Sequence, residues 1–121
     1  MFISINGSLT SKEDAKISVF DRGFNYGDGL FEVLRAHDGK VILFEEHMKR
    51  LYESAKTIML TMPYSAGQLA GIIAELLAKN ELGDAYIRIQ VTRGTGDIGL
   101  DPDNCVHPNI VIIAAELNLQ F

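Results

Sequence analysis

The chain has 121 residues, of which 47% are hydrophobic and 22% charged, which suits a single globular domain and argues against disorder. The formal net charge is −5 and the basic residues are scattered, so we expect no nucleic-acid partner, because phosphate binding requires a concentrated basic surface. The sequence has no signal-peptide pattern, no run of about 18 apolar residues and one cysteine, Cys105, so we expect a cytoplasmic protein without membrane contact or disulfides.

The N-terminal segment is expected to form a β meander. Residues 1–5 alternate apolar and polar side chains, and Asn6-Gly7 is a strong signal for a tight hairpin turn. Residues 15–20, with the sequence AKISVF, then resume an extended pattern. We therefore predict strands at residues 1–5 and 15–20.

A glycine-rich segment follows, with the sequence FDRGFNYGDGLFEVLR over residues 20–35. It contains three glycines, two aspartates and several aromatic side chains. Glycine loses more backbone freedom on folding than other residues, whereas aromatic side chains favour burial, so the segment is unlike a linker. We predict an ordered loop shaped around a bound molecule.

The next part of the chain changes from a strand pattern to a helical one. Residues 30–37 and 40–44 read as antiparallel strands joined by an Asp38-Gly39 turn. From Glu45 onward, apolar residues recur at helical spacing, which predicts a first helix.

A second helix and two strands complete the predicted fold. Ser65 and Gln68 form the pattern of a capping box, and the helix that they begin is expected to end within residues 80–84. Residues 85–94 and 109–117 are rich in β-branched side chains and predict two strands. The expected fold is a single α+β domain over residues 1–121, an antiparallel sheet with two helices packed on one face.

Four motifs occur in a fixed order along the chain: DRGFNYGDGLFEVLR, EEHMKRLYESAK, NELGDAYIRIQVTRG and GDIGLDP. Together they resemble the N-terminal domain of the class IV, or fold type IV, aminotransferases, which use pyridoxal 5'-phosphate. The resemblance covers about residues 3–117. The family includes branched-chain amino acid aminotransferases, D-amino acid aminotransferases and aminodeoxychorismate lyases. Membership implies amino acid and 2-oxo acid substrates and a homodimer or higher homo-oligomer.

The resemblance implies that Arg50 holds the cofactor phosphate. A guanidinium group suits that role, because its planar fork of donors matches a phosphate and it stays charged at any working pH. The alternative is a solvated arginine on the surface of the first helix.

The resemblance also implies six substrate-binding residues. Tyr26 and Phe31 match aromatic residues that line the substrate pocket of the branched-chain enzymes, and the tyrosine is expected to reach the partner subunit's site. Tyr86 and Arg88 are two residues apart on a predicted strand and share one face, and the arginine would receive the side-chain carboxylate of glutamate or 2-oxoglutarate. Gly99 with Leu100 resembles a loop near the neighbouring subunit's pocket.

Two of these residues have plainer interpretations. Phe31 alternates with Leu30 on a strand and could belong to the core. Arg88 could lie on the solvent face of an edge strand, and the sequence does not decide between these alternatives.

The Schiff-base lysine of the family is expected in a second, C-terminal domain that is absent from this chain. No lysine of the chain lies in the family's lysine motif, so we expect no catalytic residue here and an inactive domain in isolation. We expect no metal either, because His37, His47 and His107 show no ligand spacing with one another or with Cys105.

Three functional hypotheses remain open. The AYIR and GDIGLDP motifs favour a transaminase that acts on branched-chain amino acids and 2-oxoglutarate. A D-amino acid aminotransferase is the second, although its Arg-x-His carboxylate motif is replaced here by GDIGLDP; the lyase fits less well, because it lacks the YIR signature. The third is a binding or oligomerisation module that never meets the cofactor.

Overall fold

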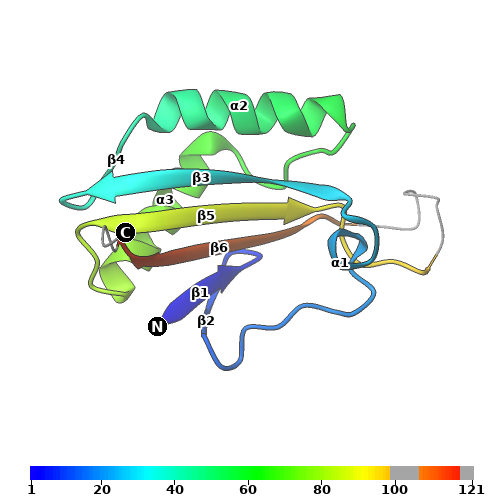
Figure 1. The fold of residues 1–121 in the computed structure, drawn as a ribbon, viewed down its shortest axis with the longest axis horizontal. Coiled ribbons are helices and arrows are strands. Elements are labelled where there is room, and N and C mark those ends of the chain that lie inside the picture. Colours follow the sequence, from blue (N-terminus) through cyan, green and yellow to red (C-terminus); the bar gives the residue numbers. More distant parts are fainter. Residues whose placement is uncertain (99–106, 118–121) are drawn as a thin grey trace.

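The computed structural model describes residues 1–98 and 107–117, and within them it shows one antiparallel sheet and three helices (Figure 1). The strands are β1 (Phe2–Ile5), β2 (Ser8–Ser11), β3 (Gly29–His37), β4 (Lys40–Val41), β5 (Ala85–Thr92) and β6 (Asn109–Glu116). The helices are α1 (Arg22–Tyr26), α2 (Phe44–Thr57) and α3 (Ala66–Lys79). The strand order is β2-β1-β6-β5-β3-β4. The predicted α+β class is confirmed.

The core lies between one face of the sheet and the helices α2 and α3. Alternate residues of the three central strands are buried on this face: Leu34 and Ala36 of β3, Ala85, Ile87, Ile89 and Val91 of β5, and Ile110, Ile112 and Ala114 of β6. The β3–β5–β6 register sets these positions beside one another. The facing helix residues are Met48, Leu51 and Ala55 of α2 and Leu69, Ile73, Leu76 and Leu77 of α3. Both long helices therefore pack on the same face, as predicted, and no helix of the described residues covers the opposite face of β3 and β5.

The second helix begins as the sequence predicts. Ser65 Oγ accepts a hydrogen bond from the Gln68 backbone N–H at 3.2 Å, and the Gln68 side chain accepts one from the Ser65 N–H at 2.9 Å. This capping box satisfies two backbone donors that would otherwise lack a partner.

The N-terminal hairpin differs from the prediction. The turn at Asn6-Gly7 is present, with φ angles of 51° and 84°, but its second strand is Ser8–Ser11. A two-residue turn pairs the residues directly on either side of it, so Ile5 lies opposite Ser8, and residues 15–20 join no strand of the described sheet.

Two further elements are shorter or newly helical. The predicted strand at 40–44 contains only Lys40–Val41, because Leu43 has a φ of 55° and α2 begins at Phe44. The glycine-rich segment is ordered, as predicted, but it contains the one-turn helix α1. None of the helices in the described residues is long and apolar enough to cross a membrane.

Candidate functional site

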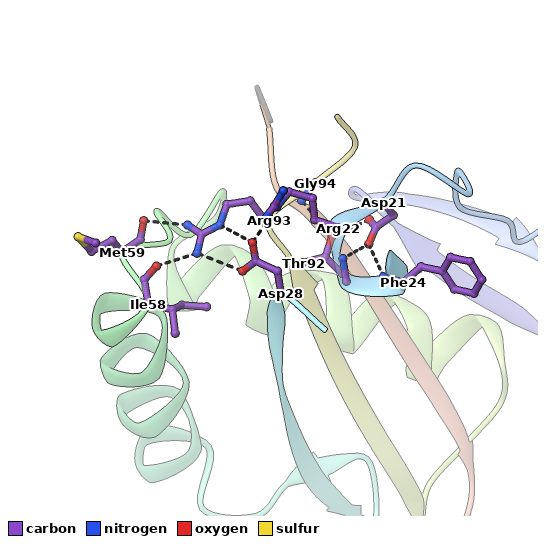
Figure 2. Close-up of polar contacts among 10 residues, drawn as sticks. Asp21, Arg22, Phe24, Asp28, Ile58, Met59, Thr92, Arg93 and Gly94 are labelled. Atoms are coloured by element: carbon purple, nitrogen blue, oxygen red, sulfur yellow. Dashed lines mark hydrogen bonds and ion pairs between the residues drawn. The ribbon is translucent and has the colours of Figure 1, made fainter. Parts of the chain in front are cut away.

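Asp21 organises the glycine-rich segment from a fully buried position (Figure 2). Its Oδ1 accepts backbone hydrogen bonds from Gly23 at 2.7 Å and Phe24 at 3.2 Å, which cap α1. Its Oδ2 accepts from Thr92 Oγ1 and from Asn109 Nδ2, both at 2.7 Å. One carboxylate thus fastens α1 to the adjacent ends of β5 and β6.

Asp28 and Arg93 connect the same segment to α2 (Figure 2). Arg93 donates to Asp28 through Nε and Nη2, at 3.1 Å each, and to the Ile58 and Met59 carbonyl oxygens at the end of α2, at 2.7 and 3.0 Å. Arg22 Nε also donates to Asp28, at 3.0 Å. Burial would raise the pKa of Asp28, but the hydrogen bonds from Arg93 and Arg22 outweigh it and lower that pKa. The carboxylate therefore stays ionised and keeps the segment in place.

The aromatic residues of this segment remain accessible. Tyr26 is 39% exposed, and the Arg22 guanidinium lies 4.7 Å from the centre of its ring. Phe31 is 56% exposed and so is not a core residue. An open cavity of about 430 Å³ lies beside it, lined by Ile17, Asp21, Gly23, Phe24, Gly27, Gly29, Leu30, Phe31, Gln90, Val91 and Thr92.

Arg88 and Phe31 form a pair on the helix-free face of the sheet. The Arg88 guanidinium carbon lies 4.1 Å from the centre of the Phe31 ring, a cation–π contact. Tyr86 shares this face, since it alternates with the buried Ile87 along β5. The edge-strand interpretation of Arg88 is wrong, because β5 lies between β3 and β6. The structure therefore brings a cation and two aromatic rings to one surface.

Arg50 lies on the other side of β3, in a cluster with Glu32 and His47. Arg50 Nε is 3.1 Å from both carboxylate oxygens of Glu32, and Nη2 also donates to Oε1. His47 Nδ1 lies 2.6 Å from the same Oε1. The hydrogen bond from Arg50 lowers the pKa of Glu32 despite the opposing effect of burial, and Glu32 in turn raises the pKa of Arg50.

The cluster leaves Arg50 able to hold a phosphate group. Its side chain is 67% exposed, and among the described residues no hydrogen bond engages Nη1. A guanidinium whose outer donors face solvent fits an anion with several acceptor oxygens. Of the residues considered for the cofactor, Arg50 thus fits the phosphate part of pyridoxal phosphate.

The Arg50 cluster and the Phe31–Arg88 pair lie on opposite faces of the sheet but near one edge of it. The short strand β4 pairs only with Ala36 and His37, so within the described residues β3 has no strand on that side from residue 29 to 34. Helix α2 runs alongside β3 (Figure 1). One molecule at this edge of β3 could therefore contact both groups, whereas Gly99 and Leu100 lie outside the described residues.

The sequence reasoning overlooked Glu32 and the contact that His47 makes with it. One signal was available, because Glu32 has the same strand phase as the buried Leu34 and Ala36. A carboxylate in a buried position needs partners, and His47 with Arg50 at i and i+3 on α2 offers two donors on one helix face. In the described part of the chain, no group of three or more His, Cys, Asp or Glu residues is placed to hold a metal ion.

Comparison with known proteins supplies the family. The model of the family described as amino-transferase class IV matches residues 29–120. A putative branched-chain-amino-acid aminotransferase of Methanocaldococcus jannaschii is 49% identical over 114 residues, 94% of this chain and 40% of that protein. A D-alanine aminotransferase of Listeria monocytogenes is 38% identical over 109 residues, 90% of this chain and 36% of that protein.

A solved structure agrees with the sequence matches. The branched-chain amino acid aminotransferase of T.th., complexed with N-(5'-phosphopyridoxyl)-L-glutamate, superposes with a TM-score of 0.89 at 28% identity. The match covers 99% of this chain and 41% of that chain. This chain belongs to the class IV aminotransferase family and spans about 40% of the length of the branched-chain relative that it matches.

Proposed function

We propose that the intact protein is a cytoplasmic, pyridoxal-phosphate-dependent transaminase that moves amino groups between branched-chain amino acids and 2-oxoglutarate. The residues described here form its N-terminal domain, and the lysine that attaches the cofactor lies outside these 121 residues. The 49% identity with a putative branched-chain enzyme favours this substrate class over the D-amino acid alternative.

The observation that carries the substrate proposal is the pairing of Arg88 with Phe31. The two substrates share an α-amino or 2-oxo acid group but differ in their side chains, one aliphatic and one carboxylate. A guanidinium can bind a carboxylate with two donors, and an exposed aromatic ring can cover an aliphatic chain. Arg88 and Phe31 together therefore suit a pocket that accepts both substrates in turn, with Tyr86 on the same face.

We assign Arg50 to the cofactor phosphate. When bound, pyridoxal phosphate supplies an electron sink that stabilises negative charge at the substrate Cα. Arg50 would anchor it from the edge of β3, while the substrate is held against the helix-free face of the same strand. Tyr26, Gly99 and Leu100 are assigned to the pocket of the partner subunit in a homodimer or higher homo-oligomer, and the exposure of Tyr26 is compatible with this.

A transaminase assay distinguishes the three functional hypotheses. The intact protein should transfer the amino group of leucine to 2-oxoglutarate with added pyridoxal phosphate, and much faster than it uses D-alanine. The 121-residue chain alone should show no turnover, because none of its lysines matches the family's lysine motif. Preference for D-alanine would support the D-amino acid hypothesis, and an intact protein inactive with every amino acid would support a non-catalytic module.

Replacing Arg50 with alanine tests the cofactor assignment. In the intact apo-protein, Arg50→Ala should weaken pyridoxal phosphate binding by roughly ten- to a hundredfold, because a charge-assisted contact to the phosphate is lost. Arg50→Lys should recover only part of this, since a point charge cannot reproduce a two-pronged contact. Equilibrium titration, followed by the absorbance of the bound cofactor, supplies the dissociation constants.

Lys49→Ala is the matched control for Arg50→Ala. Lys49 is an exposed cation one residue away on α2, and its removal changes the net charge equally. Equal weakening by both variants would show that only general electrostatic attraction is involved, and would overturn the assignment of Arg50.

A further inference from the structure

Glu32 carries a carboxylate in a position that normally holds an apolar side chain. It lies on the helix-facing side of β3, in phase with Leu34 and Ala36 and opposite Ile89 of β5. Its side chain is only 5% exposed. Burial of a charge at such a site is unfavourable unless partners compensate for the lost water.

The compensation comes entirely from the first two turns of α2 among the contacts that the described residues make. Arg50 approaches Glu32 through Nε and Nη2, which form one side of the planar guanidinium, and His47 contacts Oε1 from the preceding turn. This two-donor contact fixes the plane of the guanidinium and the direction in which its remaining edge faces. Without it, a 67% exposed arginine would sample many rotamers.

We propose that Glu32 is a positioning residue for the cofactor phosphate: together with His47 it holds the Arg50 guanidinium so that the outer donors of Arg50 face the phosphate. This inference rests on the proposed contact between Arg50 and the phosphate. It adds that the contact depends on a buried carboxylate that does not itself touch the cofactor.

Two opposing effects determine the sign of the expected result. The negative charge of Glu32 repels a phosphate, so removing it would by itself tighten binding. Glu32 also orients Arg50, so removing it would loosen binding by releasing the guanidinium. Positioning predicts a net loss of affinity, whereas a purely electrostatic role predicts a net gain.

The test compares a cofactor that has a phosphate with one that lacks it. The intact apo-protein is titrated with pyridoxal phosphate and with pyridoxal, as the parent, Glu32→Gln, Arg50→Ala and the double variant. Glutamine keeps the size of the side chain but replaces one acceptor oxygen by an NH2 group, which cannot accept from Arg50. Glu32→Gln should weaken pyridoxal phosphate binding about tenfold and pyridoxal binding less than about twofold, as expected for a residue that orients a ligand-binding group.

The double variant separates positioning from a general loss of structure. If Glu32 acts through Arg50, adding Glu32→Gln to Arg50→Ala should weaken pyridoxal phosphate binding no further. Glu46→Gln, at an exposed glutamate in the first turn of α2, is the charge-matched control and should leave affinity unchanged or slightly higher. Thermal unfolding of each variant checks that it folds.

Several results would overturn the inference. Unchanged or tighter pyridoxal phosphate binding by Glu32→Gln, or an equal loss for pyridoxal, would exclude the positioning role while leaving the assignment of Arg50 intact. If Arg50→Ala itself binds pyridoxal phosphate like the parent, the proposed function fails at Arg50 and the role of Glu32 falls with it.

A second variant covers the case in which Glu32→Gln does not fold. His47→Ala removes one donor to Glu32 from a less buried position, with 22% of the side chain exposed, and leaves the carboxylate paired with Arg50. It should weaken pyridoxal phosphate binding about threefold and leave pyridoxal binding unchanged. No selective loss in this variant would likewise count against the proposal.

Discussion

Asp21→Ala should lower the free energy of unfolding by roughly 2–4 kcal/mol, because it removes a helix cap and leaves buried donors without partners. Four donors converge on this fully buried carboxylate: the backbone N–H groups of Gly23 and Phe24, Thr92 Oγ1 and Asn109 Nδ2. An alanine side chain replaces none of these contacts. Urea-induced unfolding of parent and variant, monitored by circular dichroism, gives the difference.

Two comparison variants make the result for Asp21 specific. Asp97→Ala removes the same side chain from an exposed position and should change stability by less than about 0.5 kcal/mol. Asp21→Asn keeps Oδ1 as an acceptor for the α1 cap but directs an NH2 group at Thr92 and Asn109, so it should fall between the parent and alanine. A loss of under about 1 kcal/mol for Asp21→Ala, similar to that of Asp97→Ala, would show that the segment holds its shape without this carboxylate.

The parts of the fold that the sequence predicts are those governed by local patterns. The capping box at Ser65, the turn at Asn6-Gly7 and the alternation along β5 each depend on residues within a few positions of one another. The predicted start of the first helix, Glu45, lies one residue after the observed start at Phe44. Local geometry and periodicity determine such features, so the neighbouring sequence contains the necessary information.

The parts that could not be predicted depend on contacts between distant positions. Asp21 meets Asn109 across 88 positions of the chain, and Arg93 meets Met59 across 34. The sequence names these residues but not the strand order that brings them together. Residues 15–20 were assigned to a strand because their pattern is extended, although the short turn at 6–7 had already supplied β1 with a partner.

The glycines of the segment at 20–35 have a partly structural explanation. A Cβ on Gly23 would lie 2.4 Å from Thr92 Cγ2, and one on Gly29 would lie 2.5 Å from the Val91 carbonyl oxygen. Both glycines therefore permit close approach to β5. Their conformational freedom was expected to serve a bound molecule, and that part of the expectation stays a prediction, since β5 alone already requires the missing side chains.

The candidate site was predictable residue by residue but not as an arrangement. Arg50, Phe31 and Arg88 were each expected to contact a ligand, yet the sequence does not say that β3 separates Arg50 from the other two. Only the sheet order, with β4 too short to cover β3, shows that one edge of the sheet gives access to both faces. The assignments of cofactor and substrate residues stay predictions, and the variants above test them.

Gly94→Ala should be the most destabilising substitution of a glycine, by roughly 3–5 kcal/mol, because backbone strain and a steric clash act together. Gly94 has a φ of 113°, which residues with a Cβ rarely adopt, and an added Cβ would lie 1.9 Å from the His107 carbonyl oxygen. A backbone atom cannot move aside as a flexible side chain can. Any relaxation must displace the Gly94 carbonyl, which accepts from the Arg22 N–H at 2.8 Å, and thereby disturb α1.

Gly71→Ala provides a control with the opposite sign. Gly71 lies within α3, and no atom lies within 4 Å of the position that its Cβ would take, so alanine should stabilise the helix by about 0.5–1 kcal/mol. Urea titration of both variants measures the two changes under one protocol. If Gly94→Ala were as stable as the parent, the turn after β5 would have an alternative conformation that needs no positive φ. The tight connection between this turn and α1 would then not be required for the fold, and the aromatic segment would have to be held by Asp21 and Asp28 alone.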